Sequence, residues 1–589
     1  MSAPMKKPLF SILCLVAGVA CAQQFHPVHS RIGIPDPAAS PDALAGGTIV
    51  EYLGPSPKSL NYYLENSMMA SKVFDSLYEP LIAMDSTTLE YDRCLAEKWT
   101  ISEDKLTFTF WLDPAARWSD GRPVTARDVI WTWKTVMSPE NLTGPFKLMM
   151  GRLNPPVEVE DGKAVRFTAK RVHWQNLSSA GTFPVLPAHV FDGQNFNKVN
   201  FEFPVVSGPC ALAEFKEGFS LTLTRRKDWW RAGLPSVQGG NNFTKMVYRF
   251  YGDRDNAFDA FLKGEIDMFP VYTASKWHQI ENRVKAIQNN WIVKQSVRNH
   301  APVGFQGFAM NMRRPPFDDL RVRRAMAFLL DRRTMNHTLM YDQYFLHRSY
   351  YEDLYDSRNP CANELFEYDK EKARELLAEA GWRANPETGL LEKGGRPFVF
   401  TFLNRDSTTA KFLAIYQQAL REVGIQMNIQ VKDWSAWMKD MDSFSFDMTW
   451  AAWGAGLHKD PESQWLSTEA DQKGSNNITG FKNAEVDALI EQQKAIFDVK
   501  ERHRICRRID AILTAQVPYV LLWNINETRL LYWNKFGTPP AVLGKYSRES
   551  AYYWWLDPDL EAELKDAMSA GTPLPPQPRL IDYDQLQEE

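Results

Sequence analysis

The amino-acid sequence predicts an α/β fold, on three observations. Residues 245–270 read in order as a strand (KMVYRFYGD), a helix (DNAFDAFLKG) and a strand (EIDMFP), and Gly264 stands where the helix would end. Residues 308–340 begin the same way, with the strand FAMNM, a turn at PPF and one helix. Strands joined by a helix form parallel pairs with the helix packed on the sheet. The chain of 589 residues is also too long for one core, and the usual size of domains predicts about three to five units.

The amino terminus has the composition of an export signal. Two lysines precede the apolar run LFSILCLVAG, and Ala20-Cys21-Ala22 fits the pattern at which signal peptides are cleaved, so we expect residues 1–22 to be removed. A run of about 14 apolar residues is too short to span a bilayer. Gly18-Val19-Ala20-Cys21 is close to a bacterial lipobox, so a lipid on Cys21 stays open. We expect a periplasmic protein that is either free or tethered to the membrane.

The first half of the chain then gives short, alternating elements. Residues 23–46 are rich in Pro, Ala and Ser and are expected to form a linker. A strand (TIVEYL) follows Gly47, and a short helix is predicted before Pro80. Thr125 and Asp128 have the spacing of a capping box at the start of a helix. Further strands are predicted at 105–111, 165–168 and 220–226.

The second half is richer in helices. Asp369 is a good N-cap for a helix over 370–380, and Gly381 is a stop signal. Asn483 is expected to cap another helix, and the continuous apolar run PYVLLWNI predicts one buried strand. The tail from Gly571 is Pro-rich and expected to be extended. Two more helices are predicted over 408–423 and 501–515.

Residues 433–460 are the most distinctive stretch, with four tryptophans, Trp434, Trp437, Trp450 and Trp453. From Phe444 to Trp450 large apolar residues alternate with Ser, Asp and Thr, which predicts a strand, and the Gly-rich GAG after it is a breaker. Large apolar residues usually pack in a core. The tryptophans beside a glycine loop also suit the wall of a pocket, and both interpretations stay open.

Composition and motifs exclude several functions. A formal net charge of −4, from 68 basic and 72 acidic residues, gives no basic excess for nucleic acid. The sequence has no HExxH, GxSxG, Walker or GxGxxG motif, so the common hydrolase, nucleotide and dinucleotide sites lack their usual residues. The histidines are scattered, and we expect neither a metal site nor a cofactor. A pair of carboxylates could still serve a glycosidase.

Beyond the signal peptide the chain has four cysteines. In an oxidising compartment four cysteines can pair in three ways, and free buried thiols are an equal alternative. They are Cys94, Cys210, Cys361 and Cys506.

Six blocks, taken together and in order, resemble the family 5 extracellular solute-binding proteins of ABC importers, the dipeptide and oligopeptide-binding group. The length and the NNITGF block look most like the YejA-type members. The blocks are RWSDGRPVTARDVIWTWK (117–134), VVSGPCALAEFKEGFSLTLTRRKDWW (205–230), DRDNAFDAFLKGEIDMF (253–269), FAMNMRRPPFDDLRVRRAMAFLLDR (308–332), YDKEKARELLAEAGW (368–382) and NNITGFKNAEVDALI (476–490).

This resemblance implies the two-lobed periplasmic-binding-protein fold of class II, with an additional inserted domain. The lobes would be joined by a hinge and would close over a ligand. The implied bounds are 47–75, 205–300 and 524–570 for the first lobe, 76–204 for the inserted domain, 301–523 for the second lobe and 571–589 for the tail.

The resemblance also implies where the ligand binds. Trp434 and Trp453 match pocket tryptophans of the family, and Trp450 belongs to the same aromatic wall. Peptide-binding relatives have an Asp, three residues after the second tryptophan, that pairs with the ligand's α-amino group. Here that residue is Gly456, so either another acid substitutes or the ligand lacks a free amine. Asp460 is the nearest candidate, although an Asp before Pro is also a common turn residue.

From this resemblance we expect the substrate-binding subunit of an ABC importer. It would bind an oligopeptide or peptide-like solute without changing it and deliver it to an inner-membrane permease with ATPase subunits. We expect a monomer that needs no cofactor and is not an enzyme. The alternatives are an exported enzyme such as a glycosidase, and a binder of a metal complex or haem.

Overall fold

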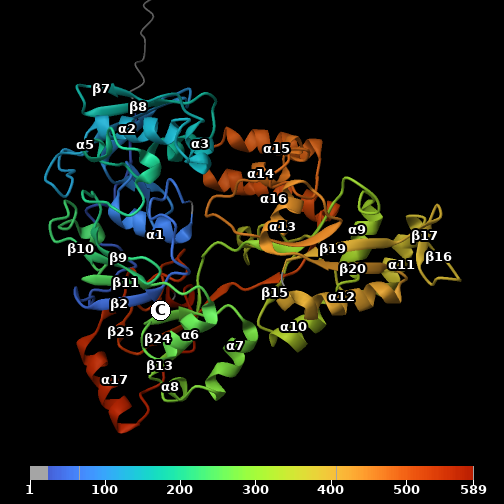
Figure 1. Ribbon diagram of the computed structural model, residues 1–589. Helices are drawn as coiled ribbons and strands as arrows, with labels where there is room; N and C mark the ends of the chain where they lie inside the picture. The colour runs from blue at the N-terminus through green and yellow to red at the C-terminus, as the bar shows by residue number, and fades with distance from the viewer. Residues whose placement is uncertain (1–23, 66, 406, 588–589) are drawn as a thin grey trace, which may run out of the picture.

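The computed structural model describes residues 24–65, 67–405 and 407–587 (Figure 1). The expected signal peptide and the lipid site at Cys21 lie outside the described residues. Within the described part of the chain, none of the helices combines the length and the apolar character that crossing a bilayer requires.

An eight-stranded sheet forms the first lobe, in the order β27-β13-β24-β12-β2-β11-β10-β9. β2 lies between β11 and β12 and is parallel to both, and α6 (Arg254–Leu262) connects these two neighbours. The β-α-β unit predicted at 245–270 is therefore confirmed, with β2 inserted between its strands. The strands are β2 (Thr48–Tyr52), β9 (Cys210–Lys216), β10 (Ser220–Arg225), β11 (Lys245–Arg249), β12 (Met268–Pro270), β13 (Ile292–Arg298), β24 (Glu527–Trp533) and β27 (Leu580–Asp582).

A five-stranded sheet forms the second lobe, in the order β20-β19-β21-β14-β22. β19 is parallel to both β20 and β21, whereas β14 is antiparallel to both of its neighbours. The prediction of a single helix after β14 is wrong. The chain forms two helices there, α9 (Leu320–Phe328) and α10 (Arg332–Met340), and Asp331 caps the second. The strands are β14 (Phe305–Met310), β19 (Val399–Asn404), β20 (Gln426–Val431), β21 (Met448–Trp453) and β22 (Tyr519–Leu521).

A third sheet, in the order β1-β5-β6-β8-β7, lies beyond the first lobe (Figure 1). The helix α2 (Ala126–Met137) covers it, and the predicted capping box is present: the Asp128 carboxylate accepts the Thr125 N–H at 2.9 Å. β1 belongs to the residues expected to form a linker and pairs with β5. The strands are β1 (Phe25–His26), β5 (Ala96–Ile101), β6 (Thr107–Leu112), β7 (Val157–Val159) and β8 (Ala164–Thr168).

Several sequence predictions of helix ends are confirmed. Asp369 accepts the Lys372 N–H at the start of α11, and Asn483 accepts two backbone N–H groups at the start of α15. The remaining long or positioning helices are α1 (Met68–Leu77), α3 (Gly144–Met150), α7 (Ala274–Gln279), α11 (Lys370–Glu379), α12 (Ala410–Glu422), α13 (Trp434–Asp442), α14 (Glu462–Trp465), α15 (Ala484–Lys494), α16 (Val499–Gln516) and α17 (Pro558–Ala570).

Two strand predictions are wrong in their extent. The strand expected from Phe444 begins only at Met448, because Phe444 has a left-handed backbone (φ 57°) at the end of α13. The run PYVLLWNI is split into β22 and β23 (Trp523–Asn524), which belong to different sheets. The tail after Gly571 contributes β27, which pairs with β13.

Two segments connect the lobes, residues 299–304 and residues 525–526. They are held side by side, because Asn524 donates to the Gly304 carbonyl at 2.8 Å. Gly304 also approaches β21 closely: a Cβ there would lie 1.9 Å from the Trp453 carbonyl oxygen. The bounds given above for the lobes and the inserted domain stay a prediction.

All four cysteines are free thiols in the structure, and only Cys361 is partly exposed.

Candidate ligand-binding site

In both large sheets, the parallel strands have their carboxyl ends beside the segments that connect the lobes. β14 starts directly after residues 299–304, and β21 runs antiparallel to it, so β21 and the parallel β19 end at this side. In the first lobe β13 ends at the connection, and β24 is antiparallel to it. β12 is antiparallel to β24 and parallel to β2, so β12 and β2 also have their carboxyl ends on the side of the connection.

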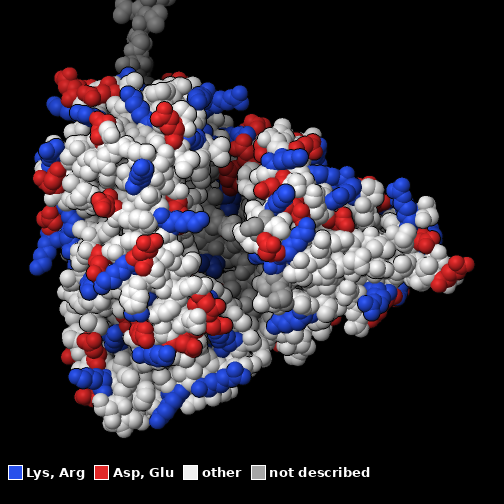
Figure 2. Space-filling view, in the orientation of Figure 1, with Lys and Arg blue, Asp and Glu red and all other residues white. Residues whose placement is uncertain are grey.

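Each lobe therefore presents a strand flanked by two parallel partners, β2 in one and β19 in the other. Ligands of open α/β sheets bind at the carboxyl ends of strands at such points. A deep hollow separates the two lobes at this position (Figure 2). The fold thus places the two favoured binding edges opposite each other across a cleft.

On the second lobe, the edge of the sheet exposes an aromatic pair beside a cation. Trp434, the first residue of α13, is 57% exposed, and its ring stacks on Trp437 at 5.2 Å. The Arg405 guanidinium, just after β19, lies 5.2 and 5.3 Å from these two rings. The Trp437 indole donates to Thr449 at 3.0 Å, which fixes the pair to β21. Trp434 thus offers a flat apolar face next to a positive charge.

The other two predicted tryptophans lie on opposite faces of the sheet. Trp450 packs with Phe308 and Trp523, and its indole donates to Gln306 at 3.0 Å. Trp453 packs in a different cluster and donates to the Tyr519 hydroxyl at 3.1 Å. Both are partly buried, so the four tryptophans do not form one continuous wall. A role of Trp450 and Trp453 in ligand binding stays a prediction.

Gly456 lies in the loop after β21, and a buried lysine holds this loop. The Lys459 side chain is 4% exposed, and its ammonium donates to the Gly456 carbonyl at 2.9 Å and to Asp353 at 2.5 Å. Asp353 also accepts the Val303 N–H at 3.3 Å. The loop is therefore tied to the connecting segment through one ion pair.

Asp460 is placed beside the inserted domain. Its carboxylate accepts the Gln175 side-chain amide at 3.1 Å and the Glu462 N–H at 3.0 Å. One atom each of His173, Asp460 and Glu462 lie within 4.8 Å of one another. Whether Asp460 meets a ligand amine stays a prediction.

The chemistry of this cluster is that of an ion pair rather than a metal site. His173 Nδ1 accepts the Gln175 N–H at 3.1 Å, so in the neutral ring Nε2 carries the proton and has no lone pair to offer a metal. Nε2 lies 3.6 Å from Glu462, whose other oxygen is 2.8 Å from the Lys494 ammonium. The His173 ring beside it and the charges of Lys494 and Arg152 lower the pKa of Glu462 to about 2.

Trp174 bridges the inserted domain and the second lobe. Its backbone N–H donates to the Lys494 carbonyl at 2.9 Å. Its ring lies 5.7 Å from the His458 ring and 4.2 Å from the Arg502 guanidinium. Figure 1 shows the third sheet and α3 next to α14 and α15 at this end of the cleft.

A second bridge closes the other end. The Tyr344 hydroxyl donates to the Tyr272 carbonyl at 3.0 Å, and Tyr341 stacks on His278 of α7 at 4.2 Å. The second lobe therefore has contacts at both ends of the hollow.

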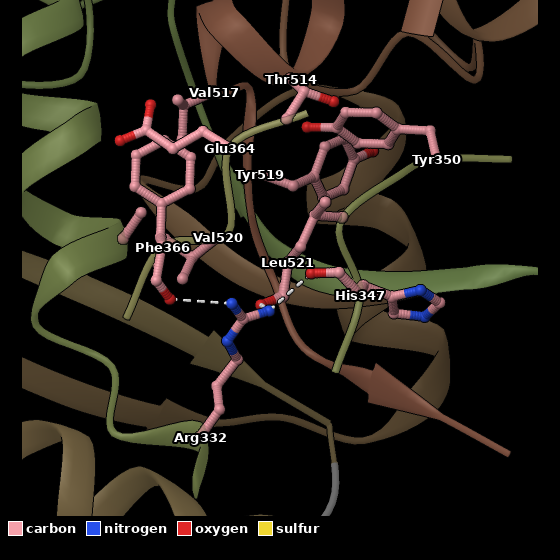
Figure 3. Close-up of a pocket in the computed structure, with 11 residues that line it drawn as sticks. Arg332, His347, Tyr350, Glu364, Phe366, Thr514, Val517, Tyr519, Val520 and Leu521 are labelled. Carbon is pink, nitrogen blue, oxygen red and sulfur yellow. Dashed lines mark hydrogen bonds between the residues drawn. The ribbon is translucent and has the colours of Figure 1, made fainter. Parts of the chain in front are cut away.

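One pocket in the second lobe has a structural role, because the arginine that lines it is bonded to backbone carbonyls (Figure 3). Arg332 donates to the carbonyls of His347, Leu521, Leu522 and Phe366 at 2.8 to 3.2 Å. The cavity of about 10 Å³ has room for about one water molecule. Arg332 thus anchors the segment that leads into the connection at residues 525–526.

Sequence reasoning missed the residues that organise this site. Lys459 precedes Asp460, which the sequence analysis singled out, but no sequence pattern indicated its ion pair with Asp353, about a hundred positions away. The bridge residue Trp174 and the cation Arg405 carried no local signal either.

The fold and the cleft define a two-lobed binding protein, and comparison with known proteins agrees. The model of bacterial extracellular solute-binding proteins, family 5 (middle region), matches residues 90–475. YejA of Escherichia coli K12 is 28% identical over 568 residues, covering 90% of this chain and 92% of YejA. The peptidoglycan-binding protein YepA of Agrobacterium fabrum is 26% identical over 601 residues, covering 92% and 96%. The oligopeptide-binding protein AppA of Bacillus subtilis, solved with a nonapeptide, has a TM-score of 0.66 at 22% identity, covering 87% and 99%.

The family model covers more than half of the chain, so the protein belongs to the family 5 solute-binding proteins. The predicted family, its likeness to YejA and the predicted two-lobed fold are confirmed. The role of the protein is that of the substrate-binding component of an ABC importer, and the glycosidase and metal-complex alternatives are not favoured.

Proposed function

We propose that this protein captures an oligopeptide or peptide-like solute between its lobes and delivers it unchanged to an inner-membrane permease with its ATPase subunits. One observation carries the proposal. The sheet edges at which ligands of α/β folds bind face each other across the cleft, and one of them exposes Trp434 beside Arg405. The oligopeptide-binding and peptidoglycan-binding names of AppA and YepA support it.

The loop after β21 suits a peptide backbone. Among the described residues, none accepts a hydrogen bond from the N–H groups of Gly454, Ala455 or Gly456. Space is open on the Cβ side of Gly454, because a Cβ there would meet no atom within 4 Å. A ligand can therefore pair with this loop as an added strand pairs with a sheet edge, while aromatic faces accept varied side chains.

We further propose that the protein is exported to the periplasm, acts as a monomer and catalyses no reaction. Its amino-terminal sequence and its family support export. The sequence has none of the common hydrolase, nucleotide-binding or dinucleotide-binding motifs, and ligand binding requires none of them.

Native mass spectrometry of the ligand-stripped protein with a random pentapeptide pool tests this function. We expect one peptide of unchanged mass per chain. The substitution Trp434→Ala is expected to weaken binding about tenfold. Tryptophan is frequent among binding hot spots, where its removal costs more than about 1 kcal/mol. Trp131→Ala is the matched control, because the Trp131 indole donates to Asp192 at 3.2 Å, away from Trp434. Release of cleaved peptide would contradict the proposal.

A further inference from the structure

We infer that a second pocket, at the junction of the inserted domain and the second lobe, binds a phosphate group. The pocket has a volume of about 460 Å³, and its walls come from residues between 152 and 176 on one side and from α14 and α15 on the other. Among the described residues, its lining includes neither Trp434 nor residues 454–457. This site therefore goes beyond the proposed function and does not depend on it.

The pocket has an excess of positive charge. Four cationic and two acidic side chains line it, which leaves two positive charges without a counter-charge. Lys494 pairs with Glu462 at 2.8 Å and with Glu491 at 2.6 Å. Within the described part of the chain, neither Lys170 nor Arg171 has an ion pair. A dianion such as hydrogen phosphate matches this excess, and arginine and lysine are the usual partners of phosphate.

A buried donor also lines the pocket. His173 is only 7% exposed, and its Nδ1 accepts the Gln175 N–H at 3.1 Å, so Nε2 carries the proton. Nε2 has no hydrogen-bond partner among the described residues, because the Glu462 oxygen beside it lies 3.6 Å away. Leaving a buried donor unpaired costs free energy. An anionic oxygen in the pocket would supply the missing acceptor.

A buried acceptor in the same lining selects among anions. Asn176 is fully buried, and its side-chain nitrogen donates to the Arg171 carbonyl at 2.7 Å, which fixes the orientation of the amide. The amide oxygen Oδ1 has no donor among the described residues. Hydrogen phosphate carries an O–H group that can donate to such an oxygen, whereas sulfate carries no proton at neutral pH. The lining therefore favours phosphate over sulfate, although both are dianions.

Isothermal titration calorimetry of the whole protein tests this site, at neutral pH and with the ionic strength held constant by sodium chloride. Inorganic phosphate and glycerol 3-phosphate are titrated separately, and sulfate is the comparison anion. We expect a phosphate compound to bind at one site per chain, and sulfate to bind at least about tenfold more weakly. Tighter binding of inorganic phosphate would assign the pocket to the free ion. Tighter binding of glycerol 3-phosphate would assign it to phosphate esters.

Two results would overturn the inference. One is that neither phosphate compound binds, which would mean that water alone satisfies His173 and Asn176. The other is that sulfate binds as tightly as phosphate, which would mean an unselective basic surface. Both results leave the proposed capture of peptides in the cleft untouched.

A charge variant locates the binding at this pocket. Arg171 is exposed, and its guanidinium has no partner among the described residues, so Arg171→Gln breaks no contact of its side chain. It should weaken phosphate binding about tenfold, because it removes one of the two uncompensated charges. Arg166→Gln is the matched control, since Arg166 is an exposed arginine of β8 outside the lining of the pocket. Equal phosphate affinities of the two variants would contradict the assignment.

Discussion

At the residue scale, single buried charges hold segments that are far apart in the sequence. Asp510 of α16 is fully buried and accepts four hydrogen bonds, each of 2.7 or 2.8 Å. The donors are the Ser349 hydroxyl, the Tyr350 N–H, the Tyr355 hydroxyl and the Asn363 amide. One carboxylate therefore fixes the whole segment from 349 to 363 on the second lobe.

Replacing this carboxylate should be costly. Asp510→Ala leaves buried donors unpaired, so we expect a loss of about 2 to 4 kcal/mol in the free energy of unfolding. Urea unfolding of the isolated protein measures it. Asp442→Ala, at the end of α13, is the control and should change stability little; an equal loss in both variants would contradict the role of Asp510.

A titratable group at the bridge gives a prediction about pH. Glu462 has a pKa lowered from 4.5 to about 2 by the His173 ring, which lies 3.6 Å away, and by Lys494. Its ionised form therefore stabilises the bridge above about pH 4.5, and this contribution is lost as the pH falls toward 2. Small-angle X-ray scattering should show the wild type opening on acidification from pH 5 to 3. Glu462→Gln should change less over the same range, and an identical change would contradict the assignment.

At the scale of elements, the sequence predicted helices better than strands. Asp369, Asn483 and Asp128 cap their helices as expected, because a cap depends on residues three positions apart. The alternation from Phe444 to Trp450 was misleading, since Phe444 ends α13 in a left-handed conformation and the strand starts at Met448.

The pairing of strands could not be predicted in the same way. β2 is inserted between β11 and β12, and β14 runs antiparallel to its neighbours, although the local patterns of both are ordinary. Such pairing depends on contacts between residues hundreds of positions apart. The site follows this rule: Trp434 was predicted from the resemblance, whereas the partners of Lys459 and Asp460, which are Asp353 and Gln175, come from distant elements.

The close approach of Gly304 to β21 predicts a sensitive position. A methyl group there would lie 1.9 Å from the Trp453 carbonyl oxygen, so the backbone would have to move. We expect Gly304→Ala to cost about 2 to 4 kcal/mol of stability and to weaken ligand binding, because the loop after β21 shifts with it. Thermal unfolding measures the loss. Gly233→Ala, with open space around its Cβ, should be neutral.

At the scale of the whole molecule, the contacts at both ends of the cleft set how often the lobes are closed. The Trp174 side chain is central to one of them, through its ring contacts with His458 and Arg502. The apparent affinity of a hinged binder falls in proportion to its closed fraction. Trp174→Ala should therefore raise the radius of gyration of the ligand-free protein in solution scattering and weaken all ligands by the same factor.

The control for this prediction is Trp131→Ala, a tryptophan of the same domain whose indole donates to Asp192 within that domain. A ligand-dependent loss in Trp174→Ala would instead mean that Trp174 contacts the ligand.

The central claim is that a peptide-like ligand lies between the lobes and pairs with the loop after β21. Hydrogen exchange of the amides of Gly454, Ala455 and Gly456, measured with and without bound peptide, tests this claim most directly. These amides have no acceptor among the described residues, so they should exchange fast in the ligand-free protein and at least tenfold more slowly when peptide is bound. Unchanged exchange at all three positions in a peptide-saturated sample would contradict it.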